Sequence, residues 1–434
     1  MQCRFLGVLA LTGLATADVV PTAPNIDVPF SITQYWGAYS PYYNAGNYTA
    51  PPEGCTVTQV NLLERHGARY PTSGAGPLIQ ASAEKLKGAQ SFNGSQYGFL
   101  SNWTYQLGTD VLIPFGAAQS FDAGQVHYTR YASLVNSTTL PFVRASSSER
   151  VVETALNWSA GFAFASDKAL PSPPPLSVTL DESRNDTLDN HMCPTAPTSQ
   201  NQTAAWTNVF APPIADRINN AAHGAHLNST DIVNLLQLCP FETVAFEKPS
   251  NFCSIFTQDD FKGLEYYIDL DDFYSTGYGN PLGPVQGVGW VNELIARLTV
   301  QPVQDETQTN STLDGSPKTF PLNRTFYADF THDKTMIAIF SALGLFPQTE
   351  NLSTSHPDAE RTWFASRLVP FSAPMIVEKM DCDGTPSIRI LVNDLVQPLT
   401  FCGARDGMCT VDNFVESQAY ARTNGNGAWA RCLG

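Results

Sequence analysis

The chain of 434 residues is long enough for one large domain or two moderate ones, and with 43% hydrophobic residues it can bury a substantial core. Its 24 basic and 40 acidic residues give a formal charge of −16, which disfavours nucleic acids and anionic membranes as partners. A chain this acidic can hold a polyanion only in a locally positive pocket, so the positions of its arginines are informative.

The N-terminus has the pattern of a signal peptide. Arg4 precedes the apolar run 5–14, and Ala15-Thr16-Ala17 is a small-residue cleavage site. The run is too short to span a membrane, so we predict a signal peptide over residues 1–17 and a secreted, extracellular protein. Its removal takes Cys3 away and leaves eight cysteines, and an even number in an exported chain favours disulfides.

Two disulfides are expected from short separations, Cys239–Cys253 and Cys402–Cys409, and the sequence alone leaves the other pairs open. No Cys-x-x-Cys pair indicates a metal site. Frequent Asn-x-Ser/Thr sequons predict a glycoprotein from a eukaryotic secretory route. The sequons begin at Asn47, Asn93, Asn102, Asn136, Asn157, Asn185, Asn201, Asn228, Asn310, Asn323 and Asn351.

Residues 56–63 are rich in β-branched side chains with a partly alternating apolar pattern, which predicts a buried strand. The strand leads into Arg65-His66-Gly67-Ala68-Arg69-Tyr70-Pro71, in which Gly67 permits a sharp turn. The guanidinium groups of Arg65 and Arg69 fit phosphate oxygens, and an imidazole beside them can attack phosphorus as a nucleophile. The alternative is a solvated loop with two surface arginines.

The middle of the chain is predominantly helical by its pattern. The predicted elements are a helix over 78–92, a strand over 141–144, a helix through about 158 that begins with a capping box of Ser146 and Glu149, helices over 231–238 and 291–298, and strands over 326–330, 374–380 and 387–392. This order favours an α/β domain that is split in the sequence by a mainly helical one. We place the α/β domain at roughly 18–80, 140–180 and 285–434, and the helical domain at roughly 81–139 and 181–284.

A second motif follows the strand predicted over 326–330. His332 and Asp333 come directly after it, and a helical pattern then runs to Gly344. Both side chains are therefore expected at a helix N-terminus, where unpaired amides and the helix dipole favour an anion. The alternative is that Asp333 is only an N-cap, a frequent role for aspartate.

Together these motifs resemble the histidine acid phosphatase family and, within it, the fungal phytases. The resemblance rests on RHGARYPT at 65–72 and THD at 331–333, and residues 279–299 also look like a phytase segment. The resemblance runs from about Gln34 to the last cysteine. The amino-acid sequences of residues 51–60 and 414–422 are most similar to those of the basidiomycete branch.

The resemblance implies the family's fold, a phosphoglycerate-mutase-like mixed α/β sandwich with an inserted helical domain. It implies a secreted acid phosphomonoesterase, working in an acidic range, that acts on phytate through a phosphohistidine and releases phosphate and lower inositol phosphates. His66 would be the nucleophile and Asp333 the proton donor to the leaving alcohol. Arg65, Arg69, Arg144 and His332 would bind the phosphate. No metal or cofactor is implied, the remaining disulfides would be Cys55–Cys382 and Cys193–Cys432, and we expect a monomer.

The substrate pocket is where the chain departs from its relatives. Gln34 and Tyr35 resemble the family's inositol-site pair. Where related phytases carry a lysine before a tyrosine-rich turn, this chain has Asp272, which we expect to weaken phytate selectivity by repulsion. Lys334 stands where asparagine or glycine is frequent and would add positive charge locally. A broad-specificity acid phosphatase is the first alternative. A non-catalytic inositol-phosphate-binding protein on the same fold is the second, disfavoured because both His66 and Asp333 are present.

Overall fold

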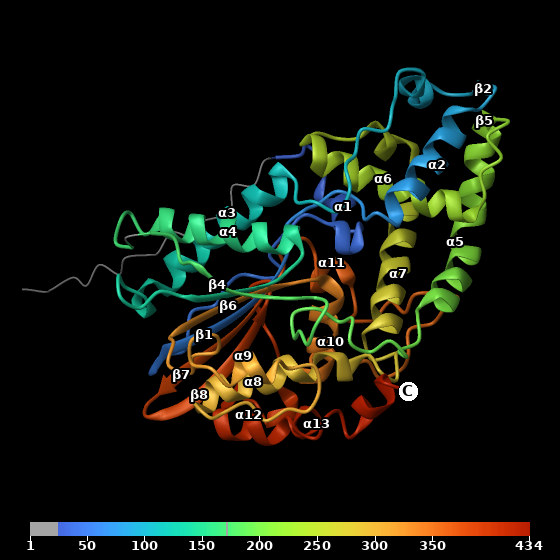
Figure 1. The fold of residues 1–434 in the computed structure, drawn as a ribbon. Coiled ribbons are helices and arrows are strands. Elements are labelled where there is room, and N and C mark those ends of the chain that lie inside the picture. The colour runs from blue at the N-terminus through green and yellow to red at the C-terminus, as the bar shows by residue number, and fades with distance from the viewer. Residues whose placement is uncertain (1–24, 171) are drawn as a thin grey trace, which may run out of the picture.

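The computed structural model describes residues 25–434 except residue 171, so the predicted signal peptide lies outside the described residues. Its centre is an eight-stranded sheet in the order β10-β8-β7-β1-β6-β3-β4, with β9 paired to β8 (Figure 1). The strands are β1 (Cys55–Arg65), β3 (Phe142–Ser146), β4 (Leu176–Leu180), β6 (Phe326–Thr331), β7 (Pro374–Cys382), β8 (Thr385–Val392), β9 (Leu395–Val396) and β10 (Met408–Thr410). Each of the five strands predicted from the sequence corresponds to one of them.

The sheet is mixed, and its parallel half positions the two sequence motifs. Strands β1, β6, β3 and β4 are parallel to one another, whereas β7 is antiparallel to β1 and β8 is antiparallel to β7. Arg65 at the end of β1 pairs in register with Thr331 at the end of β6. Because parallel strands end at the same edge of a sheet, His66 and His332 emerge side by side.

Helices cover both faces of the sheet (Figure 1). On one face lie α3 (Pro114–Tyr131) and α4 (Glu149–Ala165), whose Trp158 and Phe162 pack on Phe326 and, for Trp158, on Phe330. The other face is covered by helices that include α8 (Val288–Thr299), α10 (Asp333–Leu343), α12 (Val411–Ser417) and α13 (Ala419–Arg422).

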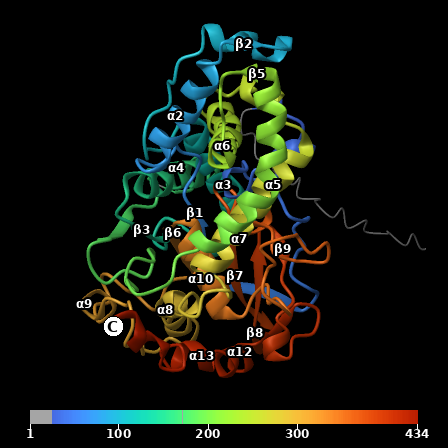
Figure 2. The ribbon, with the colours of Figure 1, turned by 90° about the vertical axis from the view of Figure 1, so that its right-hand side faces the viewer.

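The remaining long helices gather beyond one end of the sheet (Figure 2). They are α2 (Ala75–Lys87), α5 (Gln200–Ala221), α6 (Ser229–Phe246) and α7 (Gln258–Ser275). Short elements complete the chain: α1 (Phe30–Thr33), β2 (Ser91–Phe92), β5 (Ala222–His223), α9 (Ser311–Asp314) and α11 (Ala365–Leu368). Among the described residues, we find no helix with the length and apolar character needed to cross a bilayer.

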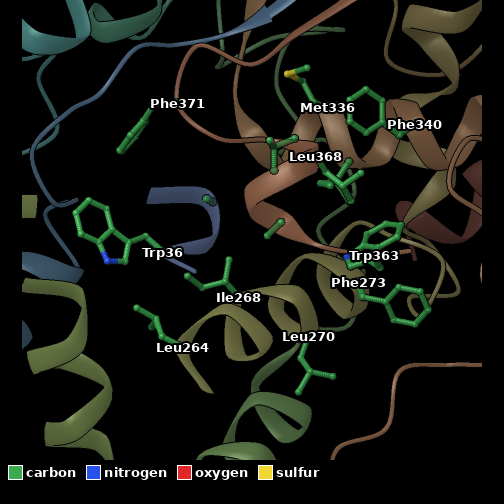
Figure 3. Packing of buried hydrophobic residues seen from close by; sticks show 14 of the residues in the cluster. Trp36, Leu264, Ile268, Leu270, Phe273, Met336, Phe340, Trp363, Leu368 and Phe371 are labelled. Atoms are coloured by element: carbon green, nitrogen blue, oxygen red, sulfur yellow. The ribbon is translucent and has the colours of Figure 1, made fainter. Parts of the chain in front are cut away.

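The helical region shares one continuous core with the sheet. Figure 3 shows Leu264, Ile268 and Phe273 of α7 in the same apolar cluster as Met336 and Phe340 of α10. Helix α10 directly follows His332, so the packing of α7 against it places the helical region beside the ends of β1 and β6.

Two local predictions were wrong. The helix expected over 78–92 ends at Lys87, and residues 91–92 form β2, which pairs with β5. The capping box is absent because Ser146 is the last residue of β3, and Ser148 is the N-cap of α4. Helix α3 packs mainly against α4, and its Tyr131 belongs to the same apolar cluster as Val60 and Phe326 of the sheet.

All four expected disulfides are formed: Cys55–Cys382, Cys193–Cys432, Cys239–Cys253 and Cys402–Cys409. Cys55 and Cys382 are register partners on β1 and β7 and lie 327 positions apart in the sequence. This disulfide therefore joins the strand that carries His66 to the C-terminal part of the sheet.

Gly124 of α3 and Gly161 of α4 allow the two helices to touch. A Cβ on Gly161 would lie 1.9 Å from the carbonyl oxygen of Phe121, a clash that the helix backbone could relieve only by moving.

We predict that Gly161→Ala separates helices α3 and α4 and destabilises the protein by about 1–3 kcal/mol or more. Thermal or urea unfolding measures this. Gly98→Ala, where an added Cβ meets nothing within 4 Å, is the control, and an equal loss in both variants would contradict the close-packing argument.

Candidate active site

His66 is buried at the end of β1, and its hydrogen bonds define its tautomer. The side chain is held 2.9 Å from the carbonyl oxygen of Gly67 through Nδ1. A carbonyl oxygen can only accept, so Nδ1 carries the hydrogen and Nε2 keeps its lone pair. The backbone is fixed by hydrogen bonds from His66 N–H to Thr331 and from Ser372 N–H to the His66 carbonyl. Gly67 is required because a Cβ there would lie 2.4 Å from the oxygen of Gly116.

The surroundings of His66 keep its ring uncharged. Burial lowers the pKa of His66 well below its usual value, and the positive charges of Arg65, Arg69 and Arg150, together with His332, lower it further. The imidazole therefore retains a free nitrogen in acidic solution. Its ring lies at an edge-on angle to that of His332, with 5.5 Å between centroids.

A pocket of about 340 Å³ opens next to this histidine pair. His332 lines it directly, whereas His66 and Arg65 are almost fully buried and are not among its lining residues. Its wall combines basic and acidic side chains. Those that bear charge or titrate are Tyr39, Arg69, Arg150, Glu182, Asp189, Tyr267, Asp271, Asp272, His332, Asp333 and Lys334.

Arg65 is held rigidly beside His66. Its guanidinium donates to the carbonyl oxygens of Ala38 and Val369 and to Asp333 Oδ2, the last at 2.6 Å. The group also lies 4.7 Å from the centre of the Phe371 ring. These contacts leave Arg65 a fixed positive charge at the end of the strand.

Asp333 is the first residue of α10, and the N-cap position belongs to His332. The alternative that Asp333 serves only as an N-cap is therefore wrong. Burial raises the pKa of Asp333, but the positive charges of Arg65 and Lys334 outweigh this and hold it below the usual range. The carboxylate reaches the pocket beside His332.

The phosphate-binding role expected for Arg144 does not fit its position. Arg144 lies inside β3, where it donates to Asp329 and Glu293 at 2.6–3.1 Å, and it does not line the pocket. Its side chain is 2% exposed and its charge is matched by these two buried carboxylates. Arg150, in the first turn of α4, lines the pocket instead and approaches His332 Nδ1 at 3.3 Å. The sequence analysis missed Arg150 because it favoured the first arginine of the segment.

Of the four residues proposed for an inositol site, two line the pocket and two do not. Gln34 and Tyr35 lie at the end of α1 and are not among the pocket-lining residues. Asp272 and Lys334 do line the pocket, and Lys334 Nζ lies 2.6 Å from Asp272 and 2.6 Å from Asp271. The charge of Lys334 is thus engaged by two carboxylates, and Asp272, 1% exposed, is not a bare negative charge.

The chain is similar to known proteins over most of its length. The model of the histidine phosphatase superfamily (branch 2) matches residues 56–393. Phytase A of Aspergillus oryzae is 40% identical over 427 residues, which cover 93% of this chain and 91% of that protein. Phytase A of Aspergillus terreus is 41% identical with the same coverage. A crystal structure of the phytase from D. castellii has a TM-score of 0.75 at 24% identity, over 93% of this chain and 88% of that chain, and supports the fold.

The two arginines allow a direct test of the assignment. We predict that Arg144→Ala destabilises the fold by about 3–5 kcal/mol, because it leaves Asp329 and Glu293 buried with less compensation. Arg150→Ala should leave unfolding little changed and weaken binding of inorganic phosphate at least about tenfold. Unfolding curves and calorimetric phosphate titration measure both. A folded Arg144→Ala variant that alone loses phosphate binding would restore the original assignment.

Proposed function

Because the chain belongs to branch 2 of the histidine phosphatase superfamily, we propose that it hydrolyses phytate through a phosphohistidine formed on His66. The observation that carries this proposal is a buried neutral imidazole, with a free Nε2, surrounded by four groups that bear or can bear positive charge. Relatives about 40% identical over most of the chain are phytases, which supports phytate as the substrate. The products would be phosphate and lower inositol phosphates.

In the first step, Nε2 of His66 attacks phosphorus and the bond to the inositol oxygen breaks. Arg65, Arg69 and Arg150 supply fixed positive charge for the transferring oxygens, and His332 adds a further donor. Such donors stabilise the charge that spreads over the equatorial oxygens in phosphoryl transfer. The hydrogen bond from Nδ1 to Gly67 holds the ring so that Nε2 is the attacking atom.

Asp333 is proposed to protonate the leaving oxygen. In the free protein the Arg65 charge favours its ionised form. A bound phosphate adds negative charge to the same group of arginines, and a nearby like charge raises the pKa of a carboxylate. Substrate therefore favours the protonated Asp333 that the step needs. Water then attacks the phosphohistidine, and Asp333 can accept its proton.

The ion pair between Asp272 and Lys334 argues against the expectation that Asp272 weakens phytate selectivity by repulsion. Lys334 compensates Asp272, and with both carboxylates ionised Asp271 gives this group of three side chains a net negative charge. Burial raises the pKa of Asp272 to about 6, so in more acidic solution the group approaches neutrality. We propose that these three residues adjust the affinity for polyanionic substrates, and that the chain retains phytate as a substrate. The alternative remains a broad-specificity acid phosphatase, which requires only the phosphate-binding part of the pocket.

We also propose that the protein is secreted and acts as a monomer. Four disulfides support passage through an oxidising compartment. The sequons predict glycans that would obstruct large interfaces.

Substitution of the two proposed catalytic residues tests the mechanism. His66→Ala should abolish phosphate release from phytate and from p-nitrophenyl phosphate, by at least about 10³-fold, because it removes the imidazole proposed to form the phosphoenzyme. Asp333→Asn should lose turnover of phytate but still form phosphoenzyme with the aryl ester, whose leaving group needs no proton. Steady-state kinetics and acid-quench trapping of the phosphoenzyme measure both. Near-normal turnover in either variant would contradict the assignment.

Charge removal from the Lys334 group tests selectivity. Asp271 is 38% exposed at its side chain, so Asp271→Asn should be tolerated and leave Lys334 with one partner instead of two. We predict that the Michaelis constant for phytate falls by about threefold to tenfold, since one repulsive charge is removed near a polyanion. The constant for p-nitrophenyl phosphate should change less than about twofold. Equal changes for both substrates would mean that residue 271 does not sense the inositol phosphates.

A further inference from the structure

Glu182 is a side chain of the pocket with no role in the mechanism above. It belongs to the loop that follows β4. Three hydrogen-bond donors outside the proposed catalytic group hold its carboxylate in place. Ser146 Oγ and the Ser148 amide donate to Oε1, at 2.7 and 3.1 Å, and Ser148 Oγ donates to Oε2 at 2.9 Å. These serines end β3 and precede α4, so the carboxylate is anchored to the sheet edge.

The anchored carboxylate contacts the active-site histidine that faces the pocket. Glu182 Oε1 lies 3.0 Å from Nε2 of His332. On the other side of the ring, Arg150 Nη2 lies 3.3 Å from Nδ1. A guanidinium can only donate, so Nδ1 accepts, and Nε2 carries the hydrogen that is donated to Glu182. The two contacts together define one tautomer of His332.

We propose that Glu182 is a positioning residue that orients His332 and stabilises its charged form when a phosphate enters the pocket. The inference rests on the proposed function. In that state Nε2–H remains bound to Glu182, and Nδ1 takes up a proton from the acidic medium. Nδ1–H can then donate to a phosphate oxygen that has drawn Arg150 toward itself. The Glu182 carboxylate balances the positive imidazolium, as a carboxylate behind a catalytic histidine does in other enzymes.

The other charges near His332 oppose or support this role. Positive groups near the ring oppose a positive charge on it, and carboxylates favour one. The charged or titratable groups that contact His332 or line the same pocket include His66 and Arg69, which follow β1, Arg150 of α4, Glu182 and Asp189 of the loop after β4, Asp271 and Asp272 of α7, and Asp333 and Lys334 of the helix that His332 caps. Since Asp333 is paired with Arg65, Glu182 is the carboxylate in direct contact with the His332 ring.

The test is the pH dependence of Glu182→Gln, which keeps the size and the acceptor oxygen but removes the charge. We predict that kcat/KM for phytate falls about tenfold near about pH 6, where protons are scarce and the negative charge of Glu182 matters most. Near about pH 3, where the medium itself supplies protons, the loss should be less than about twofold. A purely structural loss would lower kcat/KM by the same factor at every pH, and that result would overturn the proposal.

The matched control is Asp189→Asn. Asp189 also lines the pocket and also contacts a histidine, with Oδ2 2.7 Å from His191 Nδ1, but it has no contact with His332. The substitution Asp189→Asn removes one negative charge from the same pocket. We expect no comparable change in the shape of the pH profile. An identical change in both variants would show that the overall charge of the pocket, and not the contact with His332, is responsible.

Two further readouts separate this inference from the proposed function. In a His332→Asn background, adding Glu182→Gln should change kcat/KM by less than about twofold, because Glu182 then has no histidine to act on. An undiminished effect there would refute the positioning role. The ¹⁵N chemical shifts of the His332 ring with vanadate bound, assigned with His332→Asn, should change in Glu182→Gln from those of a doubly protonated ring toward those of a singly protonated ring, without any need for turnover. Unchanged ring shifts refute the inference. If His66→Ala keeps its activity, the proposed function itself fails.

Discussion

The parallel pairing of β1 with β6 is the constraint on which the rest of the site depends. The register of Arg65 with Thr331 brings the residues after both strands to one edge. His66 is then held by its backbone to Thr331, and His332 follows at the start of α10. A shift of one residue in this register would turn one of the two histidines to the opposite face of the sheet from the other. The covalent link between Cys55 and Cys382 and the packing of α7 on α10 both secure these strands.

The site solves a problem set by the composition of the chain. A protein with a net charge of −16 must concentrate positive charge to bind phosphate, yet several cations placed together repel one another. Here Arg65 contacts Asp333, Lys334 contacts Asp271 and Asp272, and His332 contacts Glu182. Arg69 and Arg150 carry no ion pair among the described residues, and they are the arginines that line the pocket. The positive charge left for a ligand is therefore at the place where phosphate is proposed to bind.

Much of this could be predicted from the sequence, and the failures have physical causes. The strands before His66 and His332 have apolar patterns that only a buried strand explains, so the two motifs were placed correctly. The choice of Arg144 failed because residue type and spacing do not show which side of a strand meets carboxylates. Its partners, Asp329 and Glu293, are far away in the sequence. The capping box at Ser146 failed because the strand extends two residues further than its apolar pattern indicates.

The buried position of Arg144 explains why its sequence context favoured a phosphate-binding role that its position does not fit. Arg144 of β3 and Arg297 of α8 both donate to Asp329 of β6, and Arg144 also reaches Glu293 of α8. This group joins two neighbouring strands to the helix that covers them. Loss of one partner would leave charge buried without compensation, so every member is constrained as strongly as a catalytic residue would be. An arginine in a short strand beside the active site is therefore equally expected for structural and for catalytic reasons. The difference lies in what surrounds it: Arg144 is enclosed by carboxylates, whereas Arg150 reaches a pocket and a histidine.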